Sequence, residues 1–115
     1  MDIWREKHDG VEYILGSMSL VKFVMPQQST LREYIKEFIS ALVKQKIVSG
    51  GEIRGVPKIV DQTIRPGEYV EEWSALVKFF KNNRSKIVPI DIALVAREGY
   101  VQAFFRVRAD EVNSI

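Results

Sequence analysis

The sequence predicts a single α+β domain over residues 1–115, with a mainly antiparallel sheet of four to five strands packed against two amphipathic helices. Both ends of the chain contain β-rich segments joined by short glycine-containing turns. Two amphipathic stretches with helical spacing lie between them. Hydrophobic residues make up 46% of the chain, as in globular proteins, so one hydrophobic core is expected.

The first elements are predicted to be strands. Segments 4–7 and 11–15 alternate apolar with polar residues on either side of His8-Asp9-Gly10, and an Asp-Gly pair in that setting favours a hairpin. Segment 20–25, LVKFVM, is apolar at almost every position. This indicates a further strand that is covered on both faces and ends at Pro26.

A helix is predicted over residues 30–48. Thr30 and Glu33 have the spacing of a capping box, in which each side chain accepts a hydrogen bond from a backbone N–H at the helix start. Gly50 and Gly51 are expected to provide the left-handed stop. The apolar positions recur at helical spacing and comprise Leu31, Tyr34, Ile35, Phe38 and Leu42.

The middle of the chain is predicted to be a loop followed by a second helix. Gly55 and Pro57 resist a helical interpretation of residues 52–65, which favours a loop and a short edge strand at 58–60. Pro66 suits the first turn of a helix over residues 66–82. Its acidic first turn would contain Glu68, Glu71 and Glu72, and its apolar stripe Val70, Trp73, Leu76, Val77 and Phe80.

A hairpin formed by segments 87–96 and 101–107 is predicted at the centre of the sheet, because these are the most apolar strands and contain no proline after Pro89. The strands flank the glycine-containing turn at 97–100. Alternation separates their residues into two faces. One face carries Ile90, Ile92, Leu94, Ala96, Val101, Ala103, Phe105 and Val107, and the other carries Ala93, Val95 and Phe104 among polar residues.

No catalytic constellation, cofactor site or metal site is predicted. The chain has no cysteine, and its one histidine, His8, lies at a turn that favours polar residues for local reasons. The glycines at 50–55 lack the Lys-Ser/Thr ending of a phosphate-binding loop. Beyond the N-terminus, the longest run of consecutive apolar residues is 92–96, far shorter than the roughly 20 residues that span a bilayer. We therefore expect a cytoplasmic protein that is not an enzyme and has no membrane contact.

One candidate interaction surface is basic. A patch made by the end of the second helix and the last strand could contact phosphates, with Phe104 available for stacking. A solvated helix terminus is the preferred explanation of these helix cations, because the helix dipole favours cations there, and the formal net charge of only +2 also weighs against nucleic acid. The patch residues are Lys78, Lys81, Arg84, Lys86, Arg106 and Arg108.

The other candidate surface is apolar and comprises Val95 and Phe104 beside Arg106. Two helices cover one face of a sheet, so apolar residues on the opposite face require a second layer. That layer could be the N-terminal segment with Trp4 and Tyr13, or it could be a partner. The preferred function is a non-enzymatic protein-binding module of inhibitor, immunity or accessory type that binds another protein or itself as a homodimer. The alternative is a small nucleic-acid-binding protein.

Overall fold

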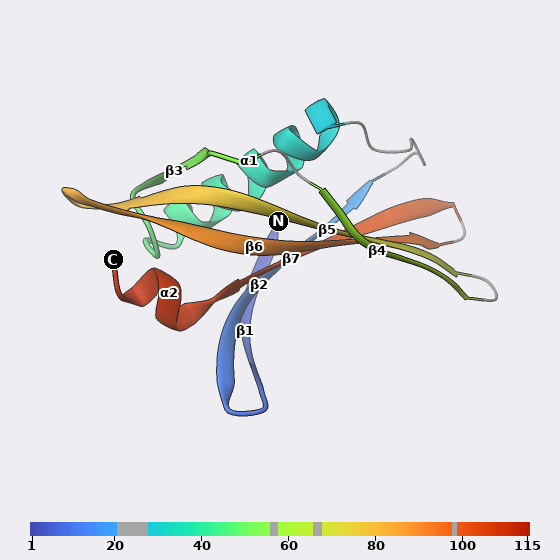
Figure 1. Ribbon diagram of the computed structural model, residues 1–115, viewed down its shortest axis with the longest axis horizontal. Helices are drawn as coiled ribbons and strands as arrows, with labels where there is room; N and C mark the ends of the chain where they lie inside the picture. Colours follow the sequence, from blue (N-terminus) through green and yellow to red (C-terminus); the bar gives the residue numbers. More distant parts are fainter. Residues whose placement is uncertain (21–27, 56–57, 66–67, 98) are drawn as a thin grey trace.

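The computed structural model describes residues 1–20, 28–55, 58–65, 68–97 and 99–115. These ranges contain one antiparallel sheet of seven strands and two helices (Figure 1). The elements in chain order are β1 (Asp2–His8), β2 (Val11–Leu20), α1 (Gln28–Lys44), β3 (Gly50–Ile53), β4 (Lys58–Arg65), β5 (Glu68–Lys81), β6 (Arg84–Arg97), β7 (Tyr100–Arg108) and α2 (Ala109–Asn113).

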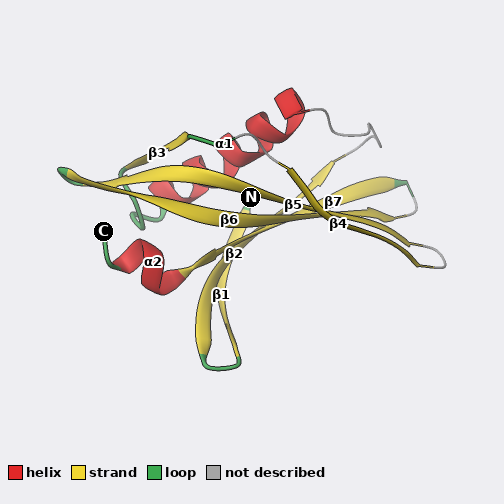
Figure 2. Cartoon of the chain, viewed as in Figure 1, coloured by secondary structure: helices red, strands yellow, loops and turns green. Residues whose placement is uncertain are grey.

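The sheet has the strand order β1-β2-β7-β6-β5-β3, and β4 pairs with β5 further along the same strand (Figure 2). The hairpin of β6 and β7 therefore lies at the centre, as the sequence predicts. The N-terminal hairpin of β1 and β2 is also confirmed, and its turn residues Asp9 and Gly10 have φ values of 52° and 79°. These left-handed conformations are the reason an Asp-Gly pair suits a two-residue turn.

One face of the sheet, called here the inner face, packs against α1. Directly paired residues on neighbouring strands share a face, so the register places Val77, Ile90 and Val107 on this face with Ile92 and Phe105. All are almost fully buried, and for Ile90, Ile92, Phe105 and Val107 this is what the predicted alternation requires. Helix α1 adds Leu31, Ile35, Phe38, Ile39 and Leu42 to this core, and α2 adds Ala109 and Val112.

The opposite face is called the outer face. In the described part of the chain, neither helix contributes a core residue to it. Its side chains range from half-buried to exposed, in contrast to the inner face. By register it carries Trp4, Tyr13, Leu15, Glu72, Ser74, Leu76, Lys78, Ile87, Pro89, Asp91, Ala93, Val95, Phe104 and Arg106.

The predicted helix over 66–82 is wrong, because Glu68–Lys81 forms β5. Alternate residues of this strand point to the core, so Trp73, Ala75, Val77 and Phe79 are buried while Leu76 is 45% exposed. Apolar residues on both faces of a strand can imitate helical spacing, and the dense aromatic and β-branched content favours a strand. Glu72 consequently does not lie in a helix first turn.

The turn after β5 explains how the chain reverses. Lys81 pairs with Arg84, which leaves Asn82 and Asn83 as a two-residue loop. Asn82 has a φ of 58°, a left-handed conformation that asparagine tolerates better than most residues. The strands β5 and β6 therefore form a long hairpin that extends beyond β7 (Figure 1).

The predicted first helix exists with different ends. It begins at Gln28, two residues before Thr30, and ends at Lys44 rather than at residue 48. Lys46, with a φ of 59°, takes the left-handed position, and the N–H of Ile47 donates to the carbonyl of Leu42, as in a Schellman motif. The left-handed stop predicted at Gly50 and Gly51 is therefore wrong, since both residues belong to β3.

One smaller prediction lies outside the described residues, one needs revision, and one short helix was not predicted. The strand predicted at 20–25 falls largely on residues 21–27, which lie outside the described residues, and β2 ends at Leu20. The edge strand predicted at 58–60 is longer, since β4 spans Lys58–Arg65. Helix α2 was not predicted, because its five residues are too few for a periodic signal.

Candidate functional site

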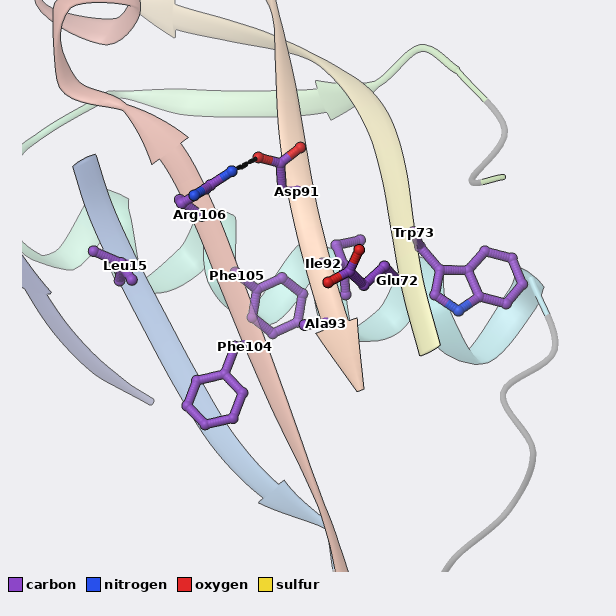
Figure 3. Close-up of a pocket in the computed structure, with 9 residues that line it drawn as sticks. All are labelled: Leu15, Glu72, Trp73, Asp91, Ile92, Ala93, Phe104, Phe105 and Arg106. Carbon is purple, nitrogen blue, oxygen red and sulfur yellow. Dashed lines mark hydrogen bonds and ion pairs between the residues drawn. The ribbon is translucent and has the colours of Figure 1, made fainter. Parts of the chain in front are cut away.

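A pocket of about 440 Å³ lies at the outer face of the sheet, over the centre of the strand order. Figure 3 looks onto this face, with α1 behind the sheet. The pocket's apolar lining residues on the outer face are Leu15 of β2, Ala93 of β6 and Phe104 of β7, and Trp73, Ile92 and Phe105 also line it. Such a hollow can receive an apolar side chain of a binding partner.

Charged side chains stand around this pocket. Both Nε and NH2 of Arg106 donate to Oδ2 of Asp91, at 3.0 and 2.7 Å (Figure 3). The guanidinium carbon of Arg106 also lies 4.5 Å from the ring centroid of Tyr13. These contacts orient Arg106, although an exposed ion pair contributes only about 0–1 kcal/mol to stability. Glu72, also at the pocket, is exposed and forms no ion pair within the described residues.

Beyond the pocket, the outer face carries protruding apolar side chains. Leu76 is 45% exposed and Ile87 is 51% exposed, and Pro89 lies directly opposite Leu76 on β6. Lys78 pairs with Ile87 across the strands, and its Nζ lies 5.7 Å from the ring centroid of Phe80. The same face therefore combines an apolar hollow with apolar projections further along β5 and β6.

The three residues predicted for protein binding lie together on the outer face. Phe104 pairs with Ala93, and Arg106 pairs with Asp91. Val95 lies opposite Gln102, two residues along β6 from Ala93 and outside the pocket lining. Phe104 and Val95 are both half-buried, which leaves apolar surface available to solvent.

The N-terminal segment does not form a layer over this surface. Trp4 pairs with Leu15, and Tyr13 pairs with Arg108, so both aromatic residues stand within the sheet. They widen the outer face beyond β7, on the side where β2 and β1 lie. The N-terminal segment was one of the two layers considered from the sequence as a cover for Val95 and Phe104. Strands β1 and β2 do not adopt that arrangement.

The six residues predicted for nucleic-acid binding do not form one patch at a helix end. Lys86 shares the inner face with Phe79, and its Nζ lies 2.7 Å from Oε2 of Glu111. Arg108 pairs with Asp110 at 2.9 Å, which raises the pKa of Arg108 and lowers that of Asp110. With Arg106 bound to Asp91, three of the six cations face carboxylates. The others are Lys78 on the outer face and Lys81 and Arg84 at the end of the β5–β6 hairpin.

His8 takes part in a small polar cluster on the N-terminal hairpin. Oε1 of Glu6 accepts a hydrogen bond from Nε1 of Trp4 at 2.9 Å, and Oε2 lies 2.8 Å from Nε2 of His8. Both contacts lower the pKa of the exposed Glu6 carboxyl, and the hydrogen bond from Trp4 has the larger effect. The cluster contains no hydroxyl or thiol that His8 could activate as a nucleophile.

The described residues contain no group of three or more His, Asp or Glu side chains that could hold a metal ion. In the same ranges, neither helix has the length and apolar character required to cross a membrane.

Sequence reasoning missed Leu15 and Glu72 as pocket residues. The side-chain alternation of β2 could have placed Leu15 on the outer face. Its position beside Arg106, however, follows only from the β2–β7 pairing, which joins distant parts of the chain. Glu72 was assigned to a helix and so to the wrong surroundings. No protein-family model, curated protein or solved structure matches this chain.

Proposed function

We propose that this chain is a non-enzymatic protein-binding module, of inhibitor, immunity or accessory type, that binds through the outer face of its sheet. The observation that carries the proposal is the pocket whose lining includes Leu15, Ala93 and Phe104, on a face to which neither described helix contributes a core residue. An apolar surface of this kind, rimmed by charge, is characteristic of protein-binding sites.

The composition of the outer face supports a protein partner. Protein interfaces have an apolar centre with aromatic residues and arginine, surrounded by a polar rim. Phe104 and Ala93 occupy the middle of the face, and Arg106 with Asp91 and Glu72 stands beside them. The charges would orient the partner, whereas the apolar groups would provide most of the affinity.

Nucleic acid is the weaker proposal. A polyanion is bound by several cations that are free to replace its counterions. Lys86, Arg106 and Arg108 already face carboxylates, and these would have to be displaced or would repel the phosphates. The formal net charge of +2 adds little attraction.

Site-specific photocrosslinking in the source cells tests the proposal. A photoreactive amino acid at Ser74, in the middle of the outer face, should give discrete protein adducts. The same group at Ser40, which is exposed on α1, is the matched control and should give none. The proposal fails if Ser74 gives no protein adduct, or if the adducts from Ser74 and Ser40 are the same.

A further inference from the structure

We infer that the partner of the outer face is a segment of another protein that is both apolar and basic, with a large apolar side chain in the pocket and a lysine or arginine against Glu72. The inference rests on the proposed function and specifies the chemistry of its partner. It follows from a charge that the pocket leaves unbalanced and from the distance between that charge and the apolar lining.

The first argument is the charge balance of the pocket lining. Asp91 is matched by Arg106, which donates two hydrogen bonds to it, whereas Glu72 is exposed and forms no ion pair within the described residues. The register of β4 adds Asp61 and Lys58 to these rows, one residue of each charge, so β4 leaves the balance unchanged. Glu72 therefore gives the pocket an excess negative charge, although the whole chain has a formal net charge of +2.

Arg106 does not compensate Glu72. Its guanidinium is directed at Asp91 (Figure 3), and the guanidinium carbon lies 4.5 Å from the ring centroid of Tyr13. Glu72 is two strands away, which is about 10 Å at the usual strand spacing. A cation from a partner is therefore the counter-charge that suits Glu72. An acidic partner would instead meet two carboxylates and a guanidinium that is already engaged.

The second argument is spacing. Glu72 pairs with Ala93, and Ala93 pairs with Phe104, so the carboxylate and the apolar centre stand in one row across the strands. The midpoint between Ala93 and Phe104 is one and a half strand spacings from Glu72, or about 7 Å. Alternate residues of an extended chain point to one side and are also about 7 Å apart. An extended segment along this row can thus place an apolar residue in the pocket and a basic residue, two positions further, at Glu72.

The third argument is that the two contacts support each other. An apolar side chain that fills the hollow displaces water from it, and a charge–charge contact is stronger where water is excluded. Because Glu72 has no ion pair within the described residues, no internal pair has to be broken when a partner cation binds. The apolar residue then provides most of the affinity, and the basic residue selects the partner.

Selection from a random peptide library displayed on phage tests the inference without knowledge of the natural partner. The full chain is the bait, as the wild type, as E72K and as the matched control E37K, which makes the same charge change at an exposed position on α1. Wild type and E37K should both select peptides in which a large apolar residue stands two positions from a lysine or arginine. E72K should select peptides with an acidic residue at that position instead.

Fluorescence anisotropy of the selected peptides gives the quantitative test. E72K should raise the Kd of peptides selected by the wild type about tenfold or more by opposing like charges, whereas E37K should leave the Kd unchanged. Phe104→Ala should also weaken binding, because it removes part of the apolar lining. Circular dichroism verifies that the variants are folded. Selected peptides without the basic residue, equal Kd values for wild type and E72K, or no peptide whose binding depends on Phe104 would each overturn the inference.

Crosslinking from Ser74 in the source cells separates this inference from the proposed function. Adducts with other proteins that E72K weakens and E37K leaves intact support both. Adducts that E72K leaves intact, or adducts only between copies of this chain, overturn the inference and keep the proposed function. The absence of any protein adduct overturns both.

Discussion

The ring of Phe38 in α1 stacks on the ring of Phe105 in β7, with centroids 5.2 Å apart and planes inclined by 16°. This contact fixes α1 to the inner face at the centre of the sheet. Because successive residues of a strand point to opposite faces, it also places Phe104 on the outer face. One aromatic pair thus determines which face is core and which face is available for binding.

Replacing Phe105 with alanine should lower the free energy of unfolding by about 3–5 kcal/mol, because it removes a fully buried ring and leaves a cavity. Phe104→Ala is the matched control and should cost less than half of that, since Phe104 is half-buried. Urea denaturation at low protein concentration measures both values. Equal losses would contradict the assignment of the two faces.

Gly16 allows α1 to approach β2 closely. A Cβ at this position would lie 2.8 Å from Cδ1 of Phe38 and 2.9 Å from Sδ of Met1. Gly16→Ala should therefore destabilise the chain by about 1–3 kcal/mol through overpacking. The neighbouring Ser17→Ala, on the outer face, should change stability little.

A second substitution identifies the cause. If the clash with the ring is responsible, Phe38→Leu should reduce the additional cost of Gly16→Ala in a double-mutant cycle. Thermal unfolding of the four proteins gives the coupling. Strict additivity would show that the loss comes from the backbone or from Met1 rather than from Phe38.

The C-terminal hairpin was predictable because two apolar, β-rich segments flank a short glycine-containing turn, and the residues of one face, such as Ile92 and Phe105, are buried as expected. Strand β5 was not predictable by the same argument, because Val77 is buried while its neighbour Leu76 is exposed and also apolar. Its identity depends on pairing with β6. The pocket requires pairing between β2 and β7, which are separated by most of the chain.

The polar cluster on the N-terminal hairpin predicts a pH dependence. Hydrogen bonds from Trp4 and His8 lower the pKa of Glu6 below 4.5, so the carboxylate form is favoured in the folded state. The resulting stability is present above pH 4.5 and is lost as the pH falls through the lowered pKa. The indole N–H of Trp4 should shift in NMR spectra with this pKa, and Glu6→Gln should abolish the shift.

Binding to polynucleotides should be weak and only slightly dependent on salt. Steep salt dependence requires several phosphate contacts, and three of the six candidate cations already face carboxylates. Fluorescence anisotropy with a labelled oligonucleotide at 50 and 200 mM salt, chosen as roughly physiological limits, measures the slope. Tight binding that Lys81→Gln and Arg84→Gln both weaken would favour nucleic acid as the partner.

Strand β6 should be the most protected part of the sheet, because it lies between β7 and β5. Leu94 is 3% exposed on its inner face, so Leu94→Asp buries an unpaired charge and should unfold the chain. Val95→Asp, one residue along on the half-buried outer face, should stay folded. Hydrogen exchange provides the independent measurement, since amides 90–95 should be among the slowest to exchange. Fast exchange there, or a stable Leu94→Asp variant, would remove β6 from the centre of the core.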